Sequence, residues 1–183
     1  MAWTKIIGPE EAQGELSGVY DHAKSRKISR FPEFLAVYTQ EPGILRWLVD
    51  TFSRPGAYYG VTAIDPTLTE LIVVVVSAAN QCHNCVVIHG KSLKRLTGDE
   101  ALVHQVATNF REAPLEAKVK VALEYAVKLT LDPTHMTRQD IHSLQDAGYS
   151  DQQIVDIAHV AAWFNYVNRI AEGLGTELRQ GRA

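Results

Sequence analysis

Apolar residues recur every three or four positions along most of this 183-residue chain, the spacing that gathers them on one face of an α-helix. Prolines, glycines and capping residues divide these stripes into separate helices. The stripes begin at or close to Pro32, Pro42, Asp99, Leu115, Thr137 and Ser150. The longest follows a Ser150–Gln153 capping box and ends before Gly175. This pattern predicts an all-α fold.

The apolar run at residues 71–76 fits two structures. Its isoleucine and four valines have high β-propensity and would suit a buried strand. The preceding residues favour a helix, because Pro66 suits a first turn and Thr67 with Glu70 has the spacing of a capping box. The run also extends into the small residues that follow it, to a length typical of a helix. We predict a helix that is apolar on all sides and buried at the centre of a bundle.

The length of the chain suits one domain with a substantial core, so we predict a single domain over residues 1–183. Residues 1–30 are more polar and are expected to form a peripheral N-terminal arm with one short helix. Residues 60–110 are expected to form the part of the core that carries the functional residues.

Composition narrows the classes of function. The formal net charge of −3 lacks the basic excess of nucleic-acid-binding surfaces, so no nucleic-acid partner is expected. No signal peptide is recognisable, and the run at 71–76 is too short to span a bilayer, so no membrane partner is expected. With only two cysteines the chain is not a disulfide scaffold, and a reducing, cytoplasmic location fits it best.

The two cysteines are three residues apart, in the segment Cys82-His83-Asn84-Cys85, and His89 follows one helical turn later. A Cys-x-x-Cys pair can close a disulfide across one turn, and each thiol lowers the pKa of the other. In a reducing compartment such a pair is more typical of catalysis or metal binding than of a structural bridge.

A peroxide-reducing thiol must be ionised near neutral pH, although the ordinary pKa of a cysteine is about 8.5. His89 lies one turn after Cys85 on the same helical face and can act as a base. Glu70 can accept the proton through His89 or a water, and a helix N-terminus at the pair adds partial positive charge. A sulfenic acid on one cysteine would then condense with the other, and an external dithiol would reduce the disulfide.

Simpler interpretations exist for the same residues. The cysteines would also suit a buried core, where unreactive thiols are common. Glu70 alone is explained as the fourth residue of a capping box. The spacing of twelve residues from Glu70 to Cys82, together with the presence of His89 after the cysteines, favours a functional site.

Two other sites are compatible with the spacing. Zinc could bind to Cys82, Cys85 and His89 with either His83 or Glu70, but structural zinc sites usually take ligands from two separated segments. A thioredoxin-like oxidoreductase would need residues 71–76 to be a strand that leads into the cysteine helix.

One stretch of the chain resembles a known family. Glu70 followed by Ser77-Ala78-Ala79-Asn80-Gln81-Cys82-x-x-Cys85-x-x-x-His89 is similar to the alkylhydroperoxidase D-like (AhpD-like) branch of the carboxymuconolactone decarboxylase superfamily. Three later segments resemble its peroxidase-related subgroup: Leu129-Thr130-Leu131-Asp132, Gly148-Tyr149-Ser150-Asp151 and Phe164-Asn165-Tyr166-Val167-Asn168-Arg169. The likeness covers roughly residues 30 to 178. It implies an AhpD-like helical bundle with the Cys-x-x-Cys helix at its centre, and a homo-oligomer.

The resemblance also implies a role for each residue. Cys85 would be the peroxidatic thiol and Cys82 the resolving thiol, with Glu70 as the base and His89 in the proton relay. Helix-dipole reasoning alone favours Cys82, which lies nearer the helix N-terminus; we adopt the family's assignment. Relatives carry a histidine immediately before the second cysteine, where this chain has Asn84.

His83 lies one residue before that family position, a shift that turns a helical side chain by about 100°. It is therefore not expected to replace the missing histidine. Further along, Asn165, Asn168 and Arg169 are expected either to line the site or to join subunits, with a structural role favoured. His159 is expected to pack in the core.

The predicted function is thiol-dependent reduction of a hydroperoxide through a Cys82–Cys85 dithiol–disulfide cycle, with Glu70 and His89 relaying the proton. The partners implied are a hydroperoxide substrate and an external dithiol reductant such as a lipoyl group. No cofactor and no metal are expected, because the sequence lacks a glycine-rich phosphate loop and a convincing metal cluster. The alternative is a non-catalytic or metal-binding helical module, or another dithiol–disulfide oxidoreductase.

Overall fold

The structure is a computed structural model, and it describes residues 2–53 and 58–176. These residues form α-helices and 3₁₀-helices, and they contain no β-strand. The predicted all-α fold is therefore confirmed. The chain divides into two compact units, each of which has helices of its own.

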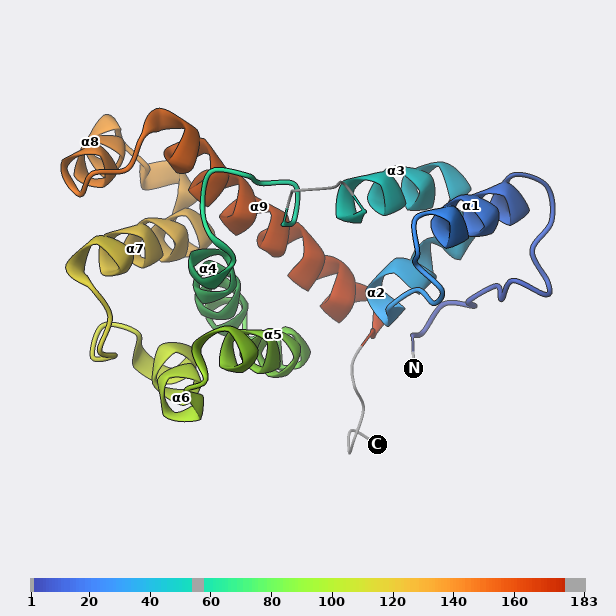
Figure 1. The fold of residues 1–183 in the computed structure, drawn as a ribbon, viewed down its shortest axis with the longest axis horizontal. Helices are drawn as coiled ribbons and strands as arrows, with labels where there is room; N and C mark the ends of the chain where they lie inside the picture. The colour runs from blue at the N-terminus through green and yellow to red at the C-terminus, as the bar shows by residue number, and fades with distance from the viewer. Residues whose placement is uncertain (1, 54–57, 177–183) are drawn as a thin grey trace. The chain divides into compact units, whose positions relative to one another are not determined.

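The first unit comprises the chain up to Gly60 together with the segment from Arg169 onward. Its helices are α1 (Gly14–Ser25), α2 (Glu33–Ala36), the 3₁₀-helix η1 (Val37–Gln40) and α3 (Pro42–Phe52) (Figure 1). Helix α1 packs against α3, and Nε2 of His22 lies 2.6 Å from Oδ1 of Asp50. This hydrogen bond lowers the pKa of Asp50. The single helix expected within residues 1–30 is α1.

The second unit, Val61–Asn168, holds the cysteines. Its elements are α4 (Pro66–Ala79), α5 (His83–Thr97), α6 (Glu100–Asn109), α7 (Ala117–Leu131), the 3₁₀-helix η2 (Pro133–His135), α8 (Arg138–Asp146) and the larger part of α9 (Asp151–Leu174). Helix α4 contacts α5, α6 and α7, and Figure 1 shows it between α5 and α7.

Helix α4 confirms the helix predicted for residues 71–76. Every residue from Leu68 to Ser77 is buried, including the polar ones, so this helix is buried on all sides. The central position in the unit therefore belongs to the helix that carries Glu70. A central place for the Cys-x-x-Cys helix, α5, is not confirmed.

The start of α4 differs from the prediction. Asp65 is the N-cap, and its carboxylate accepts hydrogen bonds from the backbone N–H groups of Thr67, at 2.8 Å, and Leu68, at 3.0 Å. Pro66 occupies the first helical turn, as expected. The predicted Thr67–Glu70 capping box is wrong, because the aspartate just before the proline already caps the helix and leaves Thr67 inside it. Glu70 is thereby left for another role.

Two other capping boxes are confirmed. Thr137 and Asp140 exchange side-chain and backbone hydrogen bonds at the start of α8, and Ser150 and Gln153 do so at the start of α9. The expectation for His159 is wrong: its ring is exposed and stacks against Trp163, because it lies on the outward side of α9.

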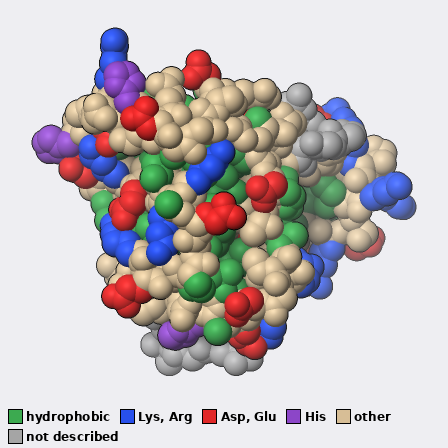
Figure 2. All heavy atoms as spheres, turned by 60° about the vertical axis from the view of Figure 1, so that its left-hand side comes forward, with side chains coloured by type: hydrophobic (Ala, Val, Ile, Leu, Met, Phe, Trp, Pro, Cys, Tyr) green, Lys and Arg blue, Asp and Glu red, His purple; other side chains and the backbone are tan. Residues whose placement is uncertain are grey.

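Among the helices of the described residues, none combines the length and the apolar character that crossing a bilayer requires. Acidic and basic side chains are interspersed on the face drawn in Figure 2, with apolar atoms visible between them. A cytoplasmic location and the homo-oligomer stay predictions.

Candidate redox site

The turn between α4 and α5 sets the position of the cysteine pair. Asn80 ends α4, and Gln81 has a φ of 58°, in the left-handed region. The N–H of Cys82 donates to the carbonyl oxygen of Ser77 at 2.9 Å, and the N–H of Gln81 donates to that of Ala78 at 3.0 Å. These two hydrogen bonds form a Schellman motif, which closes the C-terminus of a helix. Cys82 follows this closure directly and is also the N-cap of α5.

Both cysteines are buried, with exposed fractions of 0% for Cys82 and 5% for Cys85. The Sγ of Cys82 donates a hydrogen bond to the Sγ of Cys85 at 2.8 Å, and the two are thiols rather than a disulfide. Cys85 lies in the first turn of α5, where backbone N–H groups and the helix dipole favour a negative charge. The pair is therefore placed to form a disulfide after a small movement.

Glu70 of α4 and His89 of α5 form a second buried pair. Nδ1 of His89 lies 2.9 Å from Oε2 of Glu70, and the side chains are 13% and 0% exposed, respectively. A carboxyl group buried to this degree requires a hydrogen bond or an opposite charge, and His89 supplies it. When Nδ1 donates to Glu70, Nε2 is the ring atom that can accept a proton.

The surroundings of His89 restrict its ring. Phe164 of α9, itself 2% exposed, meets the imidazole edge-on with ring centroids 4.9 Å apart. His89 and Cys85 are four residues apart on α5, which places them on the same helical face. Two helices of one unit thus carry Glu70, Cys82, Cys85 and His89, and the catalytic role of each stays a prediction.

The two residues between the cysteines differ in burial. His83, at the first position of α5, is exposed, as expected for a residue that does not replace the family histidine. Asn84 is half-buried, and its Oδ1 is enclosed by protein.

A hydrogen-bond network beside the cysteine turn was not foreseen from the sequence. The amide of Asn80 donates to Oδ1 of Asn165, at 3.1 Å, and to Oδ1 of Asn168, at 3.0 Å. Asn168 in turn donates to Oγ of Ser77 at 3.2 Å, and Asn165 donates to Oγ1 of Thr130 at 2.9 Å. The signal available in the sequence was the pair of asparagines three residues apart on an otherwise apolar stripe of α9.

The structure also bears on the two alternative interpretations, a thioredoxin-like oxidoreductase and a zinc site. Residues 66–79 form a helix, so the thioredoxin-like strand that would lead into the cysteines does not exist. Within residues 2–53 and 58–176, no three His, Cys, Asp or Glu side chains are grouped as metal ligands.

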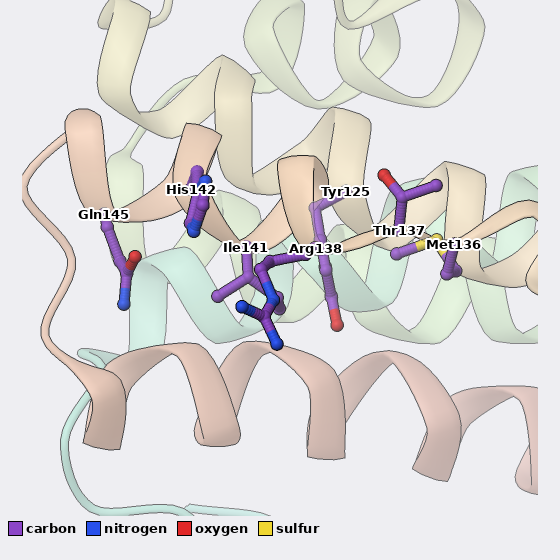
Figure 3. Close-up of a pocket in the computed structure, with 7 residues that line it drawn as sticks. All are labelled: Tyr125, Met136, Thr137, Arg138, Ile141, His142 and Gln145. Atoms are coloured by element: carbon purple, nitrogen blue, oxygen red, sulfur yellow. The ribbon is translucent and has the colours of Figure 1, made fainter.

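An open hollow of about 550 Å³ lies elsewhere in the second unit, and none of the four predicted site residues lines it. Its lining comes from the second half of α7, the segment before α8, and α8 itself: Tyr125, Met136, Thr137, Arg138, Ile141, His142 and Gln145 (Figure 3). Its charged or titratable side chains on α8, Arg138 and His142, are exposed.

Comparison with known proteins agrees with this architecture. Residues 50–128 match the model of the carboxymuconolactone decarboxylase family. An uncharacterized peroxidase-related protein from Silicibacter sp. TM1040 is 28% identical, with a TM-score of 0.76 over 94% of this chain and 86% of that chain. An uncharacterized peroxidase-related protein from Ralstonia eutropha JMP134, described as an alkylhydroperoxidase AhpD core, is 25% identical, with a TM-score of 0.77 over 98% of this chain and 93% of that chain.

The debrominase Bmp8 shares the fold at 18% identity, with a TM-score of 0.73 over 95% of this chain and 90% of that chain. At that identity the likeness concerns the fold alone. The stretch that matches the family model, residues 50–128, contains Glu70, both cysteines and His89. The family-model match over residues 50–128 and the two peroxidase-related structures support placing the chain in the carboxymuconolactone decarboxylase superfamily, with an AhpD-like fold.

Proposed function

We propose that the protein reduces hydroperoxides with the Cys82–Cys85 pair as its redox centre. The observation that carries the proposal is the presence of two side-chain pairs whose members Cys85 and His89 lie one turn apart on α5. The two thiols are 2.8 Å apart, and His89 is hydrogen-bonded to the buried Glu70 of α4 at 2.9 Å. A thiol that attacks a peroxide must lose a proton, and the departing alkoxide must gain one. A base held in one orientation one helical turn from Cys85 can serve both transfers.

Cys85 is the thiol that attacks. It is the more exposed of the two cysteines, and the hydrogen bond from Cys82 favours its thiolate. The Cys85 sulfur bonds to the distal oxygen of the hydroperoxide, the O–O bond breaks, and the alkoxide leaves as an alcohol after it takes a proton from the His89–Glu70 pair. Cys85 is then a sulfenic acid.

Cys82 completes the cycle. Its sulfur attacks the Cys85 sulfur and forms the disulfide, while the sulfenic hydroxyl leaves as water and the Cys82 proton balances the step. An external dithiol then returns two electrons and two protons. The overall reaction converts a hydroperoxide and a dithiol into an alcohol, water and a disulfide.

The Glu70–His89 pair works as a unit. Glu70 holds the Nδ1 side of the ring, and Phe164 limits its rotation, so that Nε2 presents a fixed site for the proton. A general base in place typically contributes about 10²- to 10⁴-fold to a rate. We expect His89→Ala to lower the rate of Cys85 oxidation by a factor in that range.

The test is the reduction of cumene hydroperoxide with an excess of a small dithiol, compared for wild type, Cys85→Ser, His89→Ala and the matched control His83→Ala. His83 is exposed on the same helix and should leave the rate unchanged. Mass spectrometry of Cys82→Ser should trap a sulfenic acid on Cys85. If Cys85→Ser turns over peroxide as fast as wild type, the proposal fails, and another dithiol–disulfide activity or a non-catalytic role takes its place.

A further inference from the structure

The residue that follows α4 has an uncommon backbone conformation. Gln81 has a φ of 58°, which is normally left to glycine because a side chain there costs about 1–2 kcal/mol. A strained residue of this kind persists only where its surroundings hold it, and such residues gather at functional sites. Gln81 immediately precedes Cys82, so whatever holds this turn also holds the cysteine.

The asparagine network described above is attached to this turn at two residues that precede the strained one, Ser77 and Asn80. Ser77 accepts two hydrogen bonds, one from the backbone of Cys82 to its carbonyl oxygen and one from Asn168 to its hydroxyl. Asn80, the last residue before Gln81, donates to Asn168 and to Asn165. Asn168 therefore reaches the turn through two separate hydrogen bonds.

The hydrogen bond between Asn168 and Ser77 is also shielded from water. Asn168 is 1% exposed and Ser77 is 0% exposed, and buried hydrogen bonds of this kind hold a single arrangement because an unmade one is costly. Thr130 of α7 anchors the far end, since it accepts from Asn165 and donates to the carbonyl of Ala126. Three helices thus fix one backbone position.

We propose that Asn168, acting through Ser77 and Asn80, is a positioning residue that keeps the Cys82 sulfur beside Cys85 and so sets how readily the pair forms its disulfide. The inference deepens the proposed function and rests on it for its biological meaning. The chemistry by which it is tested does not require a peroxide. Loosening the turn increases the freedom of the reduced pair, and ring closure must then remove that freedom.

The experiment measures the equilibrium between the Cys82–Cys85 dithiol and glutathione disulfide, which yields the protein disulfide and two glutathione thiols. Wild type, Asn168→Ala and Ser77→Ala are compared. We expect each variant to lower the equilibrium constant on the order of tenfold, which is about 30 mV for a two-electron couple. In the same variants a sulfenic acid formed on Cys85 should survive about ten times longer before it closes.

Two controls separate positioning from general destabilisation. Leu144→Ala removes a fully buried side chain from α8 and lowers stability without contacting the turn, so it should leave the equilibrium constant at the wild-type value. Asn109→Ala removes an exposed asparagine and should change neither quantity. Ser77→Ala deletes one oxygen only and decides the question if Asn168→Ala does not fold.

Equilibrium constants within twofold of wild type in Ser77→Ala and Asn168→Ala, with unchanged sulfenic acid lifetimes, would overturn the inference. A shift of the same size in Leu144→Ala would overturn it too, because stability alone would then explain the effect. The glutathione equilibrium is independent of peroxide turnover, so a wild type that fails to reduce peroxides would remove the proposed function and leave this test valid.

Discussion

Removal of His89 is expected to destabilise the protein far more when Glu70 is kept than when Glu70 is changed with it. The carboxyl group of Glu70 is fully buried, and His89 lies 2.9 Å from it. Removing the partner of a buried carboxylate costs about 3–5 kcal/mol, because the charge stays buried without it. His89 is 13% exposed, so water can reach part of the site and the lower end of this range applies. The edge-on contact with Phe164 is lost as well, which removes about 0.5–1.5 kcal/mol.

We therefore expect His89→Ala to lower the free energy of unfolding by about 3.5–4.5 kcal/mol. Glu70→Gln keeps an oxygen that can accept from Nδ1 and should cost about 1 kcal/mol. In the double variant no carboxylate is buried, so about 2 kcal/mol of the loss should be recovered relative to the sum of the single variants. His83→Ala, on the exposed side of the same helix, should lie within about 0.5 kcal/mol of wild type.

The measurement is urea unfolding of wild type and the four variants at one pH and one protein concentration, because assembly would make the midpoint depend on concentration. Losses in Glu70→Gln and His89→Ala that add within about 0.5 kcal/mol in the double variant would refute the reasoning, since independent sites behave in that way. Glu70 and His89 would then be held by their separate surroundings.

Three further predictions concern stability. Asp65→Ala should lower the free energy of unfolding by about 1 kcal/mol, because it deletes the N-cap of α4. Thr67→Ala should stay within about 0.5 kcal/mol of wild type in the same urea unfolding experiment. Equal losses in the two variants would show that Thr67 also caps the helix. The hydrogen bond from Lys128 lowers the pKa of Asp140, so its stabilisation is complete above the unfolded-state pKa of about 3.9 and is lost as the pH falls through the lower folded-state pKa. Wild type should accordingly lose more stability than Asp140→Asn between about pH 6 and about pH 3, and parallel curves would show that the pair contributes nothing. Gln81→Gly should raise the free energy of unfolding by about 0.5 kcal/mol. The reason is that the relief of about 1–2 kcal/mol of backbone strain exceeds the cost of the added freedom of the unfolded chain. A lower free energy in thermal or urea unfolding would mean that the glutamine side chain makes a compensating contact.

Much of the fold could be predicted because local rules determine it. The capping boxes at Thr137 and Ser150 begin helices where the residue types require it, and the apolar stripes between them end at glycines. The cap of α4 was assigned to the wrong residue, because Asp65 and Thr67 are both good N-caps and only the position of Pro66 in the first turn separates them.

From the residue spacing, only those parts of the site that lie on a single helix could be predicted. The four-residue separation of Cys85 and His89 places them on one face, and no comparable rule connects Glu70 to His89 across two helices. The same limit hid the roles of Asn80 and Asn168, which lie 88 residues apart in the chain and bond at 3.0 Å. The prediction that His159 packs in the core rested on its apolar neighbours in the sequence of α9. Its ring lies on the outward side of that helix, which those neighbours do not reveal.

The place of Cys82 between two helices has a consequence for the motion that the proposed redox cycle would require. Its N–H closes α4 and its carbonyl accepts the N–H of Val86 in the first turn of α5, so its backbone belongs to both helices at once. A backbone held in this way can move only if a helix end opens, an event of microseconds or longer, whereas a side chain turns about its Cα–Cβ bond in picoseconds to nanoseconds. Closing and reopening the disulfide by side-chain rotation would leave both helices folded in every redox state. The proposed cycle would then need no opening of a helix end between the dithiol and the disulfide.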